Sequence, residues 1–218
     1  MLIFPETTEF NKRIPKQKFY DNMSVTPELK QAFSKQIAVI YWKNKVAAST
    51  TNLAPGKRVT ELEVFELRLN QPVLDTGILP LMDREIPYHI LFLLTYQGKV
   101  QAWIGYKEPS AANQNVFKVS KYYHTDWLEP EKLSLRMDGM YLDAVYDNFI
   151  RQIAPEEIGE WSTVNGVRDA IERYDRVQKL QKQIAALEAK VRNERQFNRQ
   201  VELNAELKRL RAEMERLS

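Results

Sequence analysis

The sequence predicts an α/β (α+β) fold, with a mixed sheet and flanking helices, followed by a C-terminal helical hairpin or coiled coil. Apolar runs rich in β-branched and aromatic residues alternate with helix signals in the first part of the chain. From about residue 164 onward there is one glycine and no proline, and apolar residues recur at spacings of three and four. We therefore expect an α/β domain over residues 1–160 and a helical tail over residues 161–218.

Helix signals occur in three segments of the first part. In "TPELKQAF", Thr26 can cap a helix, Pro27 suits its first turn and Glu28 is favourable beside the positive end of the dipole. The segment "VLDTGILPLMDREI" is expected to be helical in part, with Pro80 bending the helix or marking its first turn. The third segment, "YLDAVYDNFIRQI", places five apolar residues on one helical face: Leu142, Val145, Tyr146, Phe149 and Ile150.

Strand signals fill most of the remaining first part. "VTELEVFELRL" reads as a strand, and "HILFLLTYQGKVQAWIGYK" reads as a hairpin that turns at Gln97 and Gly98. The run "ILFLL" is apolar on both faces, as expected for a central strand, and "VFKVSKYYHTDWL" predicts a further strand. Residues 37–46 could continue a helix or form a strand, and their Ile, Val, Tyr and Trp content favours the strand. The first twenty residues are expected to be irregular but ordered.

The tail carries two apolar sets that are out of phase with each other. Asn193 and Gln196 between them have the form of a capping box, which favours two helices over one straight rod. The partner of this apolar stripe can lie in the same hairpin, in a second copy of the chain or in another protein. The residues predicted to form this contact surface are Val177, Leu180, Ile184, Leu187, Leu203, Leu207, Leu210 and Met214.

Charge is strongly segregated along the chain. Residues 11–60 hold ten Lys or Arg and two acids, whereas the whole chain has a net charge of +3. A basic segment of this kind indicates a polyanion such as DNA, or an acidic surface in the fold or a partner. Tyr41 and Trp42 could stack on bases, although we expect them to be core residues. The predicted nucleic-acid contacts are Lys12, Arg13, Lys16, Lys18, Lys43, Lys45, Lys57 and Arg58.

A catalytic site is not expected, and two alternatives to a non-catalytic accessory protein stay open: a purely structural assembly factor without nucleic-acid contact, and a divergent metal-dependent nuclease. Glu61, Glu63 and Glu66, followed by Arg68, are typical of the acidic strand of a metal-dependent nuclease. Such a site needs a second acid upstream, and the sequence has none between residues 29 and 60. His89 and His124 are expected to be structural. No glycine-rich phosphate loop is present, so we expect neither a nucleotide cofactor nor a metal.

The sequence predicts a cytoplasmic protein without a membrane segment. No apolar run approaches the roughly 18–20 residues that span a bilayer. The N-terminus "MLIFPETTEF" lacks the features of a signal peptide, and the absence of cysteine excludes disulfides and thiolate chemistry.

Several stretches together resemble one bacterial family, catalogued as domain of unknown function 4391. They are "FNKRIPKQKFY", "KVAASTTNL", "VTELEVFELRL", "DREIPYHILFLL", "WIGYKE" and "FNRQVELNAELKRL". The resemblance covers nearly the whole chain, including the tail, and brings no established catalytic residues with it. It implies an accessory role beside DNA methyltransferases and helicases in restriction or phage-defence systems, and hence such proteins, DNA or a second copy of the chain as partners.

Overall fold

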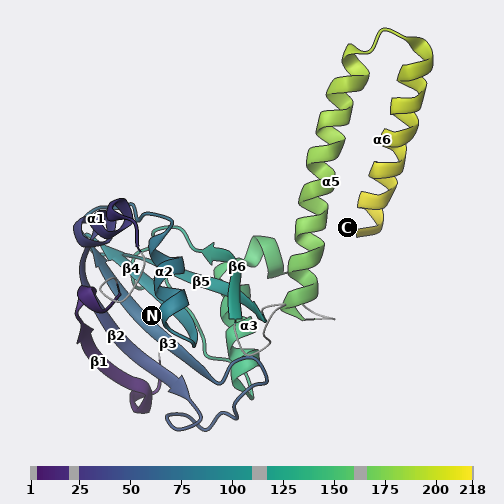
Figure 1. Cartoon of the computed structure of the whole chain (residues 1–218). Helices are drawn as coiled ribbons and strands as arrows, with labels where there is room; N and C mark the ends of the chain where they lie inside the picture. Colours follow the sequence, from purple (N-terminus) through teal and green to yellow (C-terminus); the bar gives the residue numbers. More distant parts are fainter. Residues whose placement is uncertain (1–3, 20–24, 110–116, 160–165, 218) are drawn as a thin grey trace. The chain divides into compact units, whose positions relative to one another are not determined.

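The computed structural model of this chain describes residues 4–19, 25–109, 117–159 and 166–217 (Figure 1). It forms two compact units, Met1–Pro155 and Glu156–Ser218. The boundary predicted between residues 160 and 161 lies outside the described residues. Within the described ranges, no helix is both long enough and apolar enough to cross a membrane.

The first unit is built on a six-stranded mixed sheet with the order β1-β2-β3-β4-β5-β6 (Figure 1). All neighbouring strands are antiparallel except β3 and β4, which are parallel. A parallel pair needs a crossover connection, which here contains α2. The strands are β1 (Glu9–Ile14), β2 (Ile37–Ala47), β3 (Glu61–Leu69), β4 (His89–Tyr96), β5 (Lys99–Pro109) and β6 (Phe117–His124).

Three α-helices cover the two faces of this sheet: α1 (Pro27–Gln36), α2 (Ile78–Glu85) and α3 (Leu142–Ile153). Helices α1 and α2 share one apolar cluster with Phe65 of β3 and Phe92 of β4. Successive side chains of a strand point to opposite faces of the sheet. His89 therefore points to the other face, where its ring contacts the Tyr146 ring of α3. We call these two sides the α1/α2 face and the α3 face.

The predicted mixed fold is confirmed, and several local signals act as expected. Thr26 caps α1 by accepting a hydrogen bond from the Leu29 backbone N–H. Gln97 and Gly98 both have positive φ, of 45° and 81°, as a two-residue turn between antiparallel strands requires. The prediction of irregular structure at the N-terminus is wrong for β1, although short 3-10 helices, η1 (Glu6–Thr8) and η2 (Lys16–Phe19), flank this strand.

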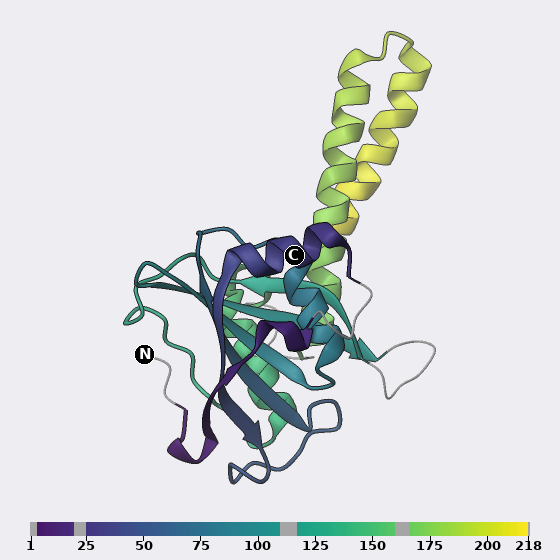
Figure 2. The same ribbon diagram turned by 60° about the vertical axis from the view of Figure 1, so that its left-hand side comes forward.

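A π-helical turn, η3 (Pro155–Gly159), begins at the last residue of the first unit, and the second unit contains two packed helices, α5 (Val167–Asn193) and α6 (Phe197–Leu217). The predicted helical hairpin is therefore confirmed (Figures 1 and 2). The predicted capping box is wrong, because Asn193 is still the last residue of α5. Glu194 instead stabilises the connection between α5 and α6, because its carboxylate accepts hydrogen bonds from the backbone N–H groups of Arg195 and Gln196.

Candidate functional site

The three glutamates of β3 do not form one site, because the pleat of the strand divides them. Glu61 and Glu63 are separated from Phe65 by even numbers of residues, so their side chains point to the α1/α2 face like that of Phe65. Glu66 points to the α3 face, where its carboxylate lies 2.7 Å from Arg68 Nε and 4.0 Å from Lys43 Nζ. A cation could not be ligated by all three carboxylates at once, and no cluster of three potential metal-ligating side chains occurs among the described residues.

Glu61 and Glu63 belong to a compact polar cluster with Trp42 and Lys45 of β2. Trp42 Nε1 donates a hydrogen bond to Glu63 Oε2 at 2.6 Å, and Lys45 Nζ lies 2.8 Å from Glu61 Oε1. The strand register explains this proximity, because Lys45 is paired with Glu63 and Trp42 with Phe65. We call these four residues the Glu63 cluster.

The two carboxyl groups of the Glu63 cluster differ in protonation. Glu63 is 2% exposed, and burial together with the adjacent Glu61 carboxylate raises its pKa to about 9. For Glu61, burial acts in the same direction, but the hydrogen bonds to Glu63 and Lys45 outweigh it and lower the pKa. At neutral pH the pair therefore shares one proton, beside the Lys45 cation. A neutral Glu63 is a proton donor rather than a ligand for a hard cation.

Four of the eight predicted nucleic-acid contacts are engaged within the fold. Lys45 and Lys43 face Glu61 and Glu66, and Lys16 Nζ donates hydrogen bonds to the backbone carbonyls of Ser34 and Ile37. Arg58 NH2 lies 2.8 Å from both oxygens of the Asp147 carboxylate. Burial alone would lower the Arg58 pKa, but the hydrogen bond and charge of Asp147, together with the charge of Asp143, outweigh it, so the pKa is raised. These cations are partly neutralised before any partner arrives.

The Arg58 contact belongs to a larger clamp between the loop before β3 and α3. The Asp143 carboxylate accepts hydrogen bonds from the backbone N–H groups of Lys57, Arg58 and Val59 at 3.0, 3.1 and 2.7 Å. Gly56 is required here, because a Cβ at this position would lie 1.8 Å from Asp143 Oδ1. The clamp gives Arg58 a structural role and leaves the exposed Lys57 side chain outside it.

The other four predicted contacts, Lys12, Arg13, Lys18 and Lys57, are exposed. None of the described carboxylates forms an ion pair with them, although Lys12 Nζ lies 4.2 Å from the centre of the Phe10 ring. Lys12 and Arg13 lie on the edge strand β1, and Lys18 lies in η2, which follows β1 in the chain. We call these three residues the edge cations. A charged edge strand also discourages edge-to-edge aggregation, so the charge alone does not identify a ligand.

Tyr41 and Trp42 lie on opposite faces of β2, and neither is fully buried. Trp42 packs on the apolar cluster of the α1/α2 face and hydrogen-bonds Glu63, which is close to the expected core role. Tyr41 lies on the α3 face, where the Arg68 guanidinium is 4.7 Å from its ring centre. Tyr41 thus adds an aromatic ring to a group of partly exposed charged side chains.

Sequence reasoning missed a second polar cluster, which connects α2, β5 and β6. Lys107 Nζ lies 2.9 Å from Asp83 Oδ1, and both side chains are 3% exposed. The Asp83 carboxylate also accepts a hydrogen bond from the Tyr122 hydroxyl, and the Tyr88 carbonyl accepts one from Lys107. Burial raises the pKa of Asp83, and the Lys107 cation opposes that shift. No sequence motif joins these residues, and only the fold brings them together.

The two histidines occupy different environments. His89 is buried between Tyr146 and Phe117, with ring centres 4.5 and 5.3 Å away. Burial, followed by the charges of Lys107 and Arg58, lowers its pKa to about 3, so it is neutral in the folded protein. His124 is exposed and stacks on Trp103 at 4.2 Å. The burial of His89 agrees with the structural role expected for it.

The predicted contact surface of the tail lies largely inside the hairpin. Ile184 and Leu187 of α5 form one apolar cluster with Leu207 of α6, and Leu203, Leu210 and Met214 pack against it. Val177 and Leu180 are also buried in the second unit. Ion pairs join the two helices, with Arg176 NH2 2.6 Å from Glu213 and Arg211 NH2 2.7 Å from Glu188. Most of the apolar residues predicted to contact a partner therefore pack against each other within the hairpin.

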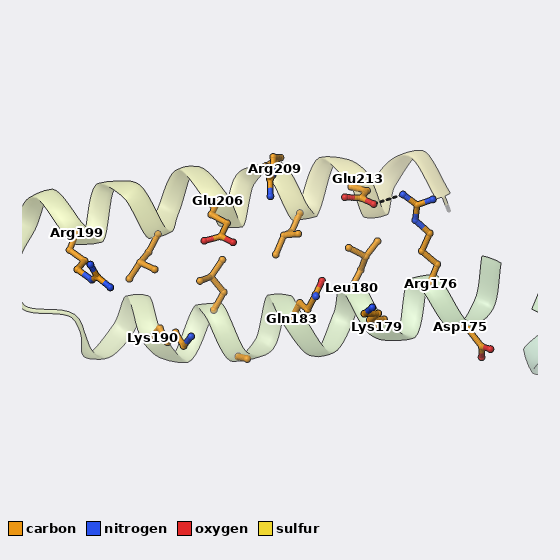
Figure 3. A pocket seen from close by; sticks show the side chains of 14 residues that line it. Asp175, Arg176, Lys179, Leu180, Gln183, Lys190, Arg199, Glu206, Arg209 and Glu213 are labelled. Atoms are coloured by element: carbon orange, nitrogen blue, oxygen red, sulfur yellow. Dashed lines mark hydrogen bonds and ion pairs between the residues drawn. The ribbon is translucent and has the colours of Figure 1, made fainter. Parts of the chain in front are cut away.

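A groove of about 1000 Å³ runs between α5 and α6, with leucines between two charged borders (Figure 3). Its charged side chains come from both helices, and cations outnumber carboxylates. Arg176 and Glu213 close one end with their ion pair (Figure 3). The lining cations are Arg176, Lys179, Lys190, Arg199 and Arg209, and the lining carboxylates are Asp175, Glu206 and Glu213.

Comparison with known proteins identifies a family but no characterised relative. The family described as a domain of unknown function (DUF4391) matches residues 2–214. Neither a curated protein nor a solved structure matches the chain.

Proposed function

The chain belongs to the DUF4391 family, and we propose that it is a non-catalytic accessory protein that contacts the phosphate backbone of nucleic acid. The proposal rests on one observation: Lys12 and Arg13 of the edge strand β1 and Lys18 of the adjoining η2 are exposed and form no ion pair with a described carboxylate. Cations that are not neutralised within the fold can replace the counterions of a nucleic-acid backbone. Sequence-independent binding with a marked dependence on salt follows from this arrangement.

Alanine substitution of the edge cations tests this proposal. The triple variant Lys12→Ala/Arg13→Ala/Lys18→Ala should weaken binding to duplex DNA and reduce the slope of log K against log salt by about 0.9 for each lost contact. The matched control is Lys99→Ala/Lys132→Ala/Arg136→Ala, which removes the same charge from three exposed sites elsewhere in the domain. Fluorescence anisotropy between about 50 and 200 mM salt measures both slopes. An unchanged slope in the edge variant, or an equal loss in the control, would contradict the proposal.

The biological setting that we propose is a bacterial DNA-modification or phage-defence system, as the family resemblance implies. In this setting the hairpin would dock a protein such as a DNA methyltransferase or helicase, or a second copy of the chain. The variant Arg199→Glu/Arg209→Glu reverses two charges that line the hairpin groove. Arg195→Glu/Lys208→Glu makes the same change outside it and serves as the control. Co-purification with neighbouring gene products and light scattering should respond to the first variant alone.

A metal-dependent nuclease that uses the β3 glutamates is the alternative. The adjacency of Glu61, Glu63 and Lys45 favours it, whereas the raised pKa of Glu63 and the opposite orientation of Glu66 oppose it. Incubation with plasmid DNA and magnesium or manganese separates the two functions. Cleavage that disappears in Glu61→Ala and Glu63→Ala would replace the accessory role by the nuclease.

A further inference from the structure

A second cavity, of about 380 Å³, lies in the α/β domain, far along the sheet from the β1 edge. It is enclosed by the residues that lead into α2 and by the α1/α2 face of β4, β5 and β6. This volume is in the range of small-ligand sites. We propose that the cavity binds an uncharged planar heterocycle with an N–H donor, which is the chemistry of a nucleobase. The lining residues that would contact such a ligand are Leu79, Leu94, Gln101, Trp103, Tyr122 and Trp127.

The aromatic walls of the cavity are held in place by contacts outside it. The Tyr122 hydroxyl is hydrogen-bonded to the buried Asp83 carboxylate, which fixes the orientation of the ring. Trp103 stacks on His124 with an interplanar angle of 25°. Trp127 packs against the apolar cluster of the domain. Aromatic rings that are already ordered can stack on a planar ligand with little loss of side-chain entropy.

Gln101 contributes a directional polar group to the lining of the cavity. Its Nε2 donates a hydrogen bond to the Thr125 carbonyl at 2.7 Å, which sets the orientation of the amide. The opposite end, Oε1, receives no hydrogen bond from the described residues and is not sealed from solvent. An oriented amide oxygen beside aromatic rings selects a ligand that presents an N–H group.

The charge of the lining narrows the ligand further. The described lining contains one carboxylate, Asp75, and no cation. Asp75 Oδ1 already accepts a hydrogen bond from the Gly77 backbone N–H at 2.8 Å. A phosphate group would find no counter-charge here, so the site suits a base or nucleoside rather than a nucleotide phosphate. This inference does not depend on the edge cations, and either proposal can fail alone.

The test uses the full chain, with saturation-transfer NMR and calorimetry as readouts. The probes are adenosine, guanosine and cytidine, a single-stranded oligonucleotide, choline, and the adenosine derivative whose exocyclic amine is dimethylated. We expect saturation transfer to at least one nucleoside, and about fivefold weaker binding of the dimethylated derivative than of adenosine, as expected for one lost hydrogen bond. Comparison of nucleoside and oligonucleotide shows whether the base arrives free or within a strand.

Variants of the protein complete the test. Gln101→Met should weaken adenosine binding about fivefold and abolish the preference over the dimethylated derivative. Trp127→Ala should remove binding, whereas Tyr88→Ala, which truncates an exposed aromatic side chain that does not line the cavity, should leave it unchanged. The dimethylated ligand keeps the test valid if Gln101→Met does not fold. Absence of binding by every nucleoside and the oligonucleotide, or preferential binding of choline, would overturn the inference.

Discussion

Two ion pairs, one in each unit of the chain, have similar lengths but opposite environments. Lys107 and Asp83 in the α/β domain lie 2.9 Å apart with both side chains 3% exposed, whereas Arg176 and Glu213 in the hairpin lie 2.6 Å apart with 61% and 38% exposure. Water screens the hairpin pair, but it barely reaches the domain pair. The comparison teaches that burial, rather than distance, decides what the loss of one partner does to stability.

The Glu63 cluster shows a third way to accommodate a carboxyl group. Glu63 is as inaccessible as Asp83 but has no cation within ion-pair distance among the described residues, since Lys45 is engaged by Glu61. Burial therefore keeps Glu63 protonated over most of the physiological pH range. Among the described residues, Asp83 is thus paired with a cation and Glu63 is neutral, while the buried Asp143 carboxylate is held by three backbone N–H groups.

The largest effect is expected when the buried pair is broken on one side. Asp83→Asn leaves the Lys107 ammonium in the interior without a counter-charge, which should lower the free energy of unfolding by about 3–5 kcal/mol. Urea unfolding followed by tryptophan fluorescence measures this change, because three of the four tryptophans, Trp42, Trp103 and Trp127, lie in the α/β domain.

The double variant Asp83→Leu/Lys107→Met is the control for that experiment. It removes both charges, so most of the lost stability should return. A loss below about 1 kcal/mol for Asp83→Asn would show that the interior solvates this pair and that the comparison between the two units is wrong.

The second effect concerns the pH dependence that arises from Glu63. Because its pKa is raised to about 9, the folded state holds a proton that the unfolded state releases above about 4.5. The unfolded state binds fewer protons in this window, so the Glu63 contribution to stability falls as pH rises from about 4.5 to 9. Glu63→Gln should remove this component, and its stability relative to the wild type should increase across the same window.

Phe65→Leu is a suitable control, since Phe65 is the next residue of β3 on the same face and has no titratable group. It should lower stability by a similar amount at each pH. Parallel pH profiles of Glu63→Gln and the wild type would mean that Glu63 is ionised in the folded protein, which would strengthen the nuclease alternative.

Local signals predicted helices and turns well, because capping residues and a Gln-Gly turn act within a few residues. The strand β1 escaped prediction because "EFNKRI" is mostly exposed and lacks alternation. Glu66 lies on the opposite face from Glu61 and Glu63 because strand side chains alternate with a period of two residues, so this separation could have been predicted from the sequence. The pairing of Asp83 with Lys107 and the cavity beside Trp103 depend on the packing of α2 on the sheet, which no local pattern encodes.

The smallest effect is expected for the hairpin pair, and a double-mutant cycle is needed to resolve it. Arg176→Ala, Glu213→Ala and the double variant should give a coupling free energy of about 0.2–1 kcal/mol, since both side chains are solvated and lose conformational freedom in the pair. The coupling should decrease when salt is raised from about 0.1 to 1 M, because the Debye length falls from about 10 to 3 Å. Thermal unfolding followed by the helical circular-dichroism signal provides the measurement. A coupling as large as the effect of Asp83→Asn would show that Glu213 is shielded from water in solution, as it would be if a second chain covered the groove that Arg176 and Glu213 line.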